Sequence, residues 1–567
     1  MSETTDFDVI VVGSGMSGGW AAKEFCEKGF KTLVLERGRS IDPMTDYVGE
    51  NVPPWELPYR GNIHPDEINA KYPKQSECYA LNDHTKTFFI NDIENPYSTP
   101  EDKPFSWIRG DQVGGRSLLW ARQTYRWSDL DFEANKKDGH GVDWPIRYAD
   151  IAPWYDYVEK FVGVSGSVEN IPQLPDGPFL PAMEMNCVEK DIKSKLEATF
   201  EDRKMIIGRT AHLTEPTQEH LELGRGMCQN RAMCQRGCSF GAFFSSVSAT
   251  LPAARRTGNL TLISDSHVLD IMYDPETGKA TGVRALNRIT RETSEYTARV
   301  IFLCASTLAS LQIMLSSMSE AMPSGFANSS GALGLGIMDH HSGAGASGTH
   351  PGFKDRYYTG RRPNGIYIPR FRNVGDDQQD FVRGYGFQGG AGRGSWKSTG
   401  AKKGFGADYK ASLGQPADWT FGLGGFGEIL PQDTNKVTLH PTKVDAWGVP
   451  QIHVECSLSA NETAMREDMS ASAKAMLEAA GLVNVNAYIS NYRPGIGIHE
   501  MGGARMGRDP ATSVLNKFNQ CHDVSNVFVT DGAALSSSAC QNPSLTYMAL
   551  TARAADYAAS QMKEGLL

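Results

Sequence analysis

The sequence lacks an excess of positive charge, an unbroken apolar run of membrane-spanning length and any internal repeat. Its 56 Lys and Arg residues and 66 Asp and Glu residues give a net charge of -10, which leaves no basic face for nucleic acid. The longest uncharged stretch, VIFLCASTLASLQIMLSSM from Val300, is interrupted by Ser, Thr and Gln, so it predicts a buried strand that runs into a helix. We therefore expect neither a nucleic-acid-binding protein nor a membrane-spanning one.

The sequence also lacks the marks of an exported, disulfide-stapled chain. MSETTDFDVIVVG reaches an apolar strand without a basic n-region or a cleavable h-region, so we expect no export signal in this chain. Ten cysteines scattered over 567 residues do not resemble a secreted disulfide framework. An apolar content of 40% with 22% charged residues is ordinary for a globular protein, and the length allows more than one domain.

One group of cysteines departs from this scatter. The stretch CQNRAMCQRGC places Cys228, Cys234 and Cys238 close together in the sequence. Their C-x5-C-x3-C spacing does not fit the closely spaced pairs of structural zinc sites, and a disulfide would leave one thiol over. Three thiolates suit a three-iron cluster, with Gly237 among the residues that let the backbone turn around it. Iron-sulfur ligation is therefore favoured, with simple packing of the cysteines as the alternative. A four-iron cluster would need a further ligand, which could be Cys78, Cys187 or a non-cysteine group.

The N-terminal segment DFDVIVVGSGMSGGWAAKEFCEKGFKTLVLERG predicts a strand, a glycine turn, a helix and a second strand. Gly13 suits the tight turn, Gly15 the close approach of a pyrophosphate, and Gly18 the packing of the helix on the strand. Glu36 ends the second strand, where its carboxylate can accept hydrogen bonds from a ribose. This combination indicates a dinucleotide, either FAD or NAD.

The C-terminal segment NVFVTDGAALSSSACQNPSLTYMALTARAADYA favours the flavin. Its short strand brings Asp531 and Gly532 to a turn, and a helix is predicted to start near Pro543 with its N-terminal amides toward a flavin ring. An N-terminal dinucleotide unit completed by a C-terminal segment is a common arrangement in flavoproteins.

Four motifs together resemble the glucose-methanol-choline (GMC) oxidoreductase family. They are the N-terminal fingerprint, VGGRSLLW from Val113, GIHEMGGARMG from Gly497 and QNPSLTYMAL from Gln541. Within that family, the cysteine group is similar to that of bacterial FAD-dependent glucoside 3-dehydrogenase and glucose dehydrogenase catalytic subunits, which supports an iron-sulfur cluster of the 3Fe-4S type. Residues 343–491 match the family poorly.

The resemblance implies a bilobal α/β (α+β) fold, with a Rossmann-like FAD domain and a second, mainly antiparallel-sheet substrate domain. The FAD domain, with the cysteine group, is expected from residues 1–45, 100–150, 215–340 and 495–567. The substrate domain and cap are expected from 46–99, 151–214 and 341–494. In the motif that holds a flavin-linked histidine in some members, the position is Leu119, so we expect non-covalent FAD. The expected cofactor-binding residues are Gly13, Gly15, Ser17, Gly18, Glu36, Arg37, Gly114, Gly115, Ser117, Val268, Asp531, Gly532 and Asn542.

The resemblance also implies a catalytic pair, His499 and Asn542. An imidazole can take the hydroxyl proton while the carbinol hydride leaves for the flavin, and an amide can hold the substrate oxygen. By themselves, His499 could be a hydrogen-bonded loop residue and Asn542 an N-cap of the last helix. The adjacent His340 and His341 we interpret as structural or flavin-side packing.

The implied reaction is oxidation of a pyranose ring hydroxyl, at C3 of a glucoside to give a 3-keto sugar, with C1 oxidation of glucose as the main alternative. Electrons would leave through the cluster to a cytochrome c-type acceptor, with a small partner subunit. Co-export with that partner would place the protein in the periplasm; otherwise it is cytoplasmic. A cluster-free sugar oxidase is the second alternative, and the catalytic pair disfavours a flavin-containing electron-transfer subunit.

Two stretches of the expected substrate domain have contrasting patterns. NKVTLHPTKVDAWGVPQIHVEC alternates like antiparallel strands. The glycine-rich stretch between Gly384 and Gly427 predicts a mobile loop whose aromatic side chains either stack on a sugar or tuck into the protein. Its aromatic residues of interest are Trp396, Phe405, Tyr409 and Trp419.

Overall fold

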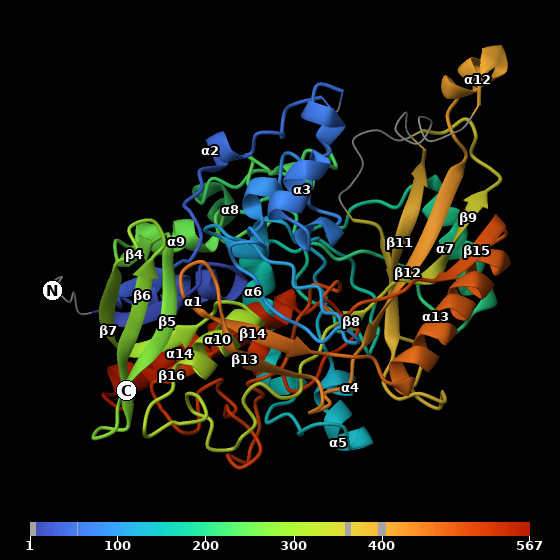
Figure 1. The fold of residues 1–567 in the computed structure, drawn as a ribbon. Helices are drawn as coiled ribbons and strands as arrows, with labels where there is room; N and C mark the ends of the chain where they lie inside the picture. The colour runs from blue at the N-terminus through green and yellow to red at the C-terminus, as the bar shows by residue number, and fades with distance from the viewer. Residues whose placement is uncertain (1–6, 54, 358–363, 395–403) are drawn as a thin grey trace.

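The computed structural model describes residues 7–53, 55–357, 364–394 and 404–567, and it contains two lobes, each built on a seven-stranded sheet (Figure 1). The predicted bilobal α/β architecture is confirmed. A separate hairpin, β13 (Lys436–Val444) and β14 (Pro450–Glu455), confirms the alternating pattern predicted for this region. It lies against α10 (Thr307–Ser316), where Gln312 donates a hydrogen bond to the Pro450 carbonyl at 2.7 Å.

The sheet of the first lobe has the strand order β4-β2-β1-β7-β6-β5, with β16 also paired to β7. Strands β1, β2, β4, β7 and β16 are parallel, whereas β5 and β6 extend the sheet as antiparallel strands. The bounds are β1 Phe7–Val12, β2 Thr32–Leu35, β4 Leu260–Ile263, β5 Ser266–Asp274, β6 Lys279–Asn287, β7 Thr293–Leu303 and β16 Val527–Val529.

The parallel part of this sheet is buried on both faces, which explains the continuous apolar run of β1. Val9 and Val11 face a cluster built with α1 (Met16–Glu27) and α14 (Ser544–Lys563). Ile10 and Val12 face the largest core cluster of the protein, which also contains residues of α10. Strand β7 continues into α10, as the stretch from Val300 predicts.

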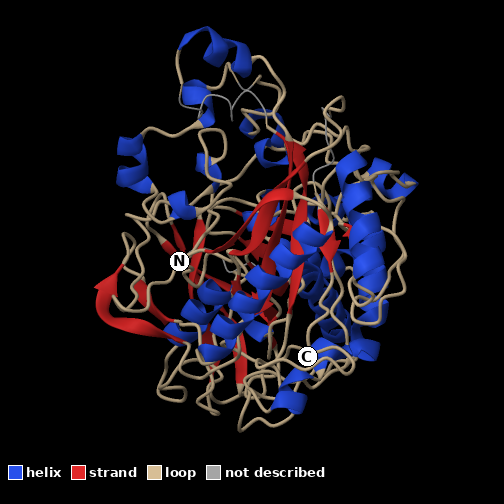
Figure 2. Ribbon diagram, turned by 90° about the vertical axis from the view of Figure 1, so that its right-hand side faces the viewer, coloured by secondary structure: helices blue, strands red, loops and turns tan. Residues whose placement is uncertain are grey.

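The sheet of the second lobe is antiparallel, with the order β15-β9-β12-β11-β10-β3 and with β8 also paired to β12. Helices α7 (Cys187–Thr199) and α13 (Ala460–Ala479) cover its outer face (Figures 1 and 2). The bounds are β3 Ile206–Ile207, β8 His340–His341, β9 Ala344–His350, β10 Ile366–Ile368, β11 Tyr385–Arg393, β12 Trp419–Glu428 and β15 Val483–Ile489.

The loop predicted between Gly384 and Gly427 is wrong at both ends of this stretch, which form the central strands β11 and β12. The glycines reflect close strand packing: a Cβ added to Gly389 would lie 2.2 Å from the Gly422 carbonyl oxygen. Of the aromatic residues, Trp419 is buried in the core, Tyr409 lies on a short helix, Phe405 is exposed, and Trp396 lies outside the described residues.

The remaining helices are short, apart from α6 (Tyr148–Val162), which lies against α14. Among the described residues, no helix combines the length and the apolar character needed to cross a membrane. The short helices are α2 Pro43–Asp46, α3 Pro65–Lys71, α4 Asp129–Phe132, α5 Ala134–Asp138, α8 Gln218–Glu222, α9 Thr250–Arg256 and α12 Gly406–Leu413.

Candidate active site

A cavity of about 1080 Å³ is lined by residues of both lobes. Its volume is at the upper end of the range usual for small-molecule and cofactor sites. The first lobe contributes the glycine turn after β1, and the second contributes Gln388 of β11 and Phe426 of β12. The expected catalytic residues His499 and Asn542 line the same cavity.

The three fingerprint glycines occupy the positions that a dinucleotide fold requires. Gly13 has a φ of +95°, and an added Cβ would lie 2.5 Å from the Cys304 carbonyl oxygen. At Gly18 an added Cβ would lie 1.9 Å from the Gly13 carbonyl oxygen, so only glycine lets α1 approach β1. At Gly15, which caps the N-terminus of α1, the nearest atom would be 3.9 Å away. The turn therefore leaves space for a phosphate group at a helix N-terminus.

Glu36 at the end of β2 holds this turn in place. Its Oε2 accepts hydrogen bonds from the Ser14 amide at 3.0 Å and the Ser14 hydroxyl at 2.6 Å, and its Oε1 accepts one from the Gly38 amide at 2.8 Å. Burial raises the pKa of Glu36 above its usual value. The carboxyl group both lines the cavity and fixes the loop that would meet a dinucleotide.

The other expected cofactor residues lie around the same cavity. Gly18 and Gly114 stand behind its lining, where their missing side chains permit close packing. The residues that line it are Gly13, Gly15, Ser17, Glu36, Arg37, Gly115, Ser117, Val268, Asp531, Gly532 and Asn542. Because these residues combine an open glycine turn, a helix N-terminus and a terminal acid, they fit a dinucleotide cofactor.

His499 and Asn542 are neighbours across the cavity wall. The Asn542 Nδ2 atom lies 3.4 Å from His499 Nε2, and the Asn542 Oδ1 atom accepts a hydrogen bond from Gln388 Nε2 at 2.7 Å. Burial, with His340 and Arg116 nearby, lowers the pKa of His499 well below its usual value. A neutral imidazole is thereby available to accept a proton.

Three further residues contact the expected pair or the loop that carries it, and the sequence analysis gave none of them a catalytic role. His340, interpreted as structural, has its Nδ1 atom 2.8 Å from His499 Nδ1. Asp339 accepts hydrogen bonds from the amides of Gly495 at 2.8 Å and His499 at 2.9 Å, which fixes the loop that carries the imidazole. Burial and the neighbouring Glu500 raise the pKa of Asp339 to about 6. Gln388, in the supposed loop, orients the amide of Asn542.

Asn542 does not act as a helix cap. Helix α14 begins at Ser544, its N-cap is Pro543, and no side chain caps it. The confirmed start near Pro543 instead leaves the Asn542 side chain free to bind Gln388 and approach His499.

The cysteine group lies on a loop that reaches the cavity through Cys234. Cys234 Sγ is 3.5 Å from His212 Nε2, and Arg122 donates a hydrogen bond to the Cys234 carbonyl at 3.2 Å. All ten cysteines are free thiols. Within the part of the chain that the structure describes, however, no three His, Cys, Asp or Glu side chains form a metal-binding group. Cys228, Cys234 and Cys238 therefore do not form a ready ligand set, and the iron-sulfur site stays a prediction.

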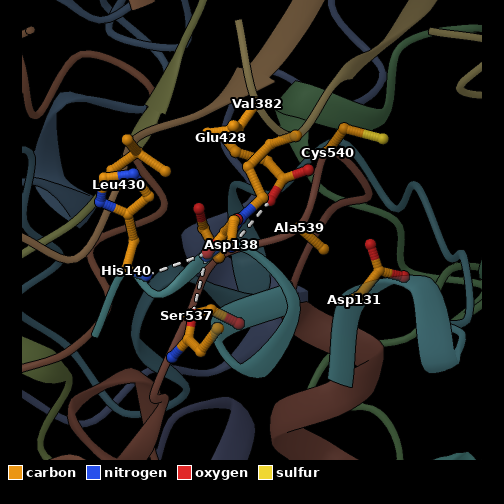
Figure 3. A network of polar contacts seen from close by, with 12 residues as sticks. Asp131, Asp138, His140, Val382, Glu428, Leu430, Ser537, Ala539 and Cys540 are labelled. Atoms are coloured by element: carbon orange, nitrogen blue, oxygen red, sulfur yellow. Dashed lines mark hydrogen bonds and ion pairs between the residues drawn. The ribbon is translucent and has the colours of Figure 1, made fainter. Parts of the chain in front are cut away.

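A buried network of charges supports the segment that carries Asn542 (Figure 3). Glu428 Oε1 accepts a hydrogen bond from Arg370 at 3.3 Å, and its Oε2 accepts one from Arg383 at 3.4 Å. Arg383 also forms an ion pair with Asp138 of the first lobe. Burial raises the pKa of Glu428 to about 7 and that of the nearby Asp131 to about 6. These contacts join the two lobes beside the loop of Ser537, Ala539 and Cys540.

Known proteins share this organisation along the whole chain. The GMC oxidoreductase N-terminal model matches residues 214–341, and the C-terminal model matches residues 431–551. A 2-methyl-1,2-propanediol dehydrogenase of Mycolicibacterium austroafricanum is 28% identical, over 97% of this chain and 94% of that protein. The fructose dehydrogenase large subunit of Gluconobacter japonicus is 25% identical over the full length of both chains.

A solved structure shows the same fold. The crystal structure of pyridoxine 4-oxidase from Mesorbium loti superposes with a TM-score of 0.57 at 15% identity, over 97% of this chain and 98% of that one. The fold, the cavity and both matched domains agree with binding of FAD and with oxidation of CH-OH groups. The chain therefore carries matches to the N- and C-terminal domains of the GMC oxidoreductase family.

Proposed function

We propose that the protein is a sugar dehydrogenase that oxidises a pyranose ring hydroxyl, at C3 of a glucoside, to give a 3-keto sugar. The observation that carries this proposal is a group of carboxamides in the cavity that contains the catalytic pair. The carboxamides of Gln123, Asn364 and Gln388 line the cavity together with Asn542. The preference for C3 derives from the resemblance of the cysteine group to that of the glucoside 3-dehydrogenases.

Carboxamides suit a sugar because each one both donates and accepts hydrogen bonds, as each sugar hydroxyl does. Two of them are held in place: Asn364 donates to Thr210 Oγ1 at 2.6 Å, and Gln123 Oε1 accepts from Tyr125 at 2.6 Å. A wall of fixed amides can therefore orient a ring with several hydroxyls.

The chain's own groups account for the movement of the proton. The substrate hydroxyl donates its proton to His499 Nε2, while the Asn542 Nδ2 amide donates a hydrogen bond to the developing alkoxide. FAD, when non-covalently bound, supplies the acceptor for the hydride of the carbinol carbon. The substrate loses one proton and one hydride, and its C-O bond becomes a carbonyl.

We further propose that Cys228, Cys234 and Cys238 hold a 3Fe-4S cluster through which electrons pass to a cytochrome c-type protein, with a small partner subunit. Support comes from Cys234, which lines the cofactor cavity, and from the relative named as a large subunit. Met227 and Phe240 beside these cysteines are exposed, which gives the loop an apolar surface that a protein acceptor could cover.

Anaerobic mixing with substrate tests the proposed reaction. Methyl glucoside should bleach the flavin absorbance, and NMR should identify a 3-keto product. Glucose turnover without methyl glucoside turnover would instead establish C1 oxidation, because methyl glucoside has no free anomeric hydroxyl. If 2-methyl-1,2-propanediol bleached the flavin and the sugars did not, the substrate would be a small diol rather than a sugar.

His499→Ala is the matching variant. It should retain FAD, judged by the flavin spectrum after gel filtration, and should reduce the rate of bleaching at least 100-fold, because the base is lost. An unchanged rate would remove His499 from the mechanism.

A further inference from the structure

The atoms around His499 determine which of its nitrogens carries the proton. His340 Nε2 lies within hydrogen-bonding distance of the Ala539 carbonyl oxygen. A carbonyl oxygen only accepts, so His340 Nε2 must carry the hydrogen. The neutral ring has one N-H, and His340 Nδ1 is therefore a bare acceptor. His340 is fully buried, and burial lowers its pKa to about 4, so the ring stays neutral.

The tautomer of His340 determines the tautomer of His499. His340 Nδ1 and His499 Nδ1 are 2.8 Å apart, and one of the two atoms must donate. Because His340 Nδ1 is bare, His499 Nδ1 carries the hydrogen, and neutral His499 has a bare Nε2. The rings meet edge to face, with an angle of 89° between their planes.

The orientation of the Asn542 amide follows from the bare His499 Nε2. The atom of Asn542 that faces it at 3.4 Å must be the Nδ2 donor, since an oxygen there would oppose two lone pairs. Asn542 Oδ1 then points away and accepts from Gln388 Nε2 at 2.7 Å. If Gln388 were turned to present its oxygen, Asn542 would be forced into the wrong orientation.

We propose that His340 and Gln388 are positioning residues that set, from opposite sides, the hydrogen-bond polarity of the catalytic pair. The Ala539 carbonyl fixes the tautomer of His340, and His340 in turn fixes the tautomer of His499. Gln388 holds the amide of Asn542. One acceptor and one donor then face the same substrate oxygen. Ala539 and Asn542 belong to one loop, so its position fixes both members of the pair. This inference deepens the proposed function and rests on it for the roles of His499 and Asn542.

Selective 15N-histidine labelling of the FAD-loaded protein tests the relay without a substrate. The His499 signals are assigned by their absence in His499→Gln. We expect His499 Nε2 to resonate as an unprotonated nitrogen and Nδ1 as a protonated one. Protonation on Nε2 would overturn the inference. The result does not depend on which alcohol is oxidised: a bare Nε2 together with no reduction by any sugar would refute only the proposed function.

Variants of His340 separate positioning from simple packing. His340→Leu removes the acceptor for His499 Nδ1 and should slow flavin reduction at least tenfold, because His499 can then adopt the wrong tautomer. His340→Asn retains an oxygen near the original Nδ1 and should restore much of the rate. The matched control is His341→Leu, a fully buried neighbour on β8 whose ring contacts Met465, and it should leave the rate within about twofold. Equal rates for His340→Leu and His340→Asn would contradict the relay.

Gln388 is tested by the type of kinetic defect. Gln388→Met removes the donor at similar volume. Gln388→Glu replaces the donor by an acceptor, which would turn the Nδ2 group of Asn542 toward residue 388 and away from His499. Both should lower the limiting rate of flavin reduction at saturating substrate, and Gln388→Glu more than Gln388→Met. A higher KM with an unchanged limiting rate would show that Gln388 only binds the substrate and would overturn its positioning role.

Discussion

Arg116 and the buried Glu500 form an ion pair, with 2.7 Å between Arg116 Nη2 and Glu500 Oε2. Glu500 is 1% exposed and directly follows His499 in the chain. Arg116 belongs to the turn after Gly115, and its guanidinium also donates to the Ile498 carbonyl at 3.4 Å. The pair therefore joins the flavin-side turn to the loop that carries His499.

Arg116→Met should destabilise the protein by about 3 kcal/mol, because it leaves the Glu500 carboxylate buried without its partner. Urea unfolding of the FAD-loaded protein measures the loss. Adding Glu500→Gln to this variant should recover part of it, since the unpaired charge is then removed. A double variant less stable than Arg116→Met would show that Glu500 is held by other contacts.

Two fingerprint glycines should differ in what their replacement affects. Gly15→Ala meets no atom closer than 3.9 Å, so we expect a normal fold with at least tenfold weaker FAD binding, because the methyl group occupies the pyrophosphate space. Gly18→Ala brings a methyl group against the Gly13 carbonyl and should instead lower the urea midpoint. Fluorescence titration of FAD and circular dichroism distinguish the two; unchanged FAD affinity in Gly15→Ala would argue against this placement.

Asn542→Leu should slow flavin reduction by about 100-fold or more, which is the usual cost of removing one hydrogen-bond donor to a developing oxyanion. Asn542→His retains an N-H donor and should lose less. Stopped-flow measurement at saturating substrate gives both rates. If leucine and histidine variants were equally slow, the amide would matter for shape rather than for its hydrogen bond.

The charge network beside this loop predicts a pH dependence of stability. The pKa of Glu428 is raised to about 7 from an ordinary value of 4.5. As the pH rises through this interval, the unfolded chain gives up the proton first, so the free energy of unfolding falls. We expect Glu428 to account for about 3 kcal/mol of that fall, because one pKa unit corresponds to about 1.4 kcal/mol, and urea unfolding at several pH values would measure it.

Glu428→Gln should flatten the curve between about pH 5 and pH 7, because the amide does not titrate. Asp143→Asn is a control of opposite sign. Hydrogen bonds from Arg147 and Arg508 outweigh burial and lower the pKa of Asp143, so this group stabilises the protein above its unfolded pKa and loses that effect in acid. A Glu428→Gln curve parallel to the wild type would mean that Glu428 is ionised throughout.

The proposed cluster predicts about three irons and acid-labile sulfides per flavin in protein purified without oxygen. Cys234→Ser should remove most of the iron, since it deletes one of three ligands, and should slow reduction of cytochrome c more than reduction of flavin by substrate. Cys187→Ser, on α7 of the other lobe, is the matched control. If wild-type protein contained flavin but neither iron nor sulfide, the cysteines would have only a packing role, and the sugar oxidase would be favoured.

The flavin lobe was predictable because its signals are local. The turn at Gly13, the helix that follows and the acid at Glu36 lie in one short segment, and in the structure Gly13 has a steric role and Glu36 a hydrogen-bonding role within the turn. The proposed catalytic residues His499 and Asn542 were predicted from motifs, and the structure brings them together.

The sheet of the second lobe was not predictable in the same way. Gly389 and Gly422 favour a loop when only their sequence neighbours are considered, whereas their actual neighbours are each other across two strands. Likewise, His340 approaches His499 from 159 positions away, and Gln388 approaches Asn542 from 154 positions away. A pattern based on short spacing contains no information on contacts of that range.

Strand β16 is the last strand to join the first lobe, and it places Asp531 and Gly532 in the wall of the cavity. A ribosome that has made the glycine fingerprint must still synthesise almost the whole chain before this wall exists. The complete site for FAD can therefore form only late in synthesis. A chain truncated before β16 would contain the glycine turn but would lack this wall of the flavin site.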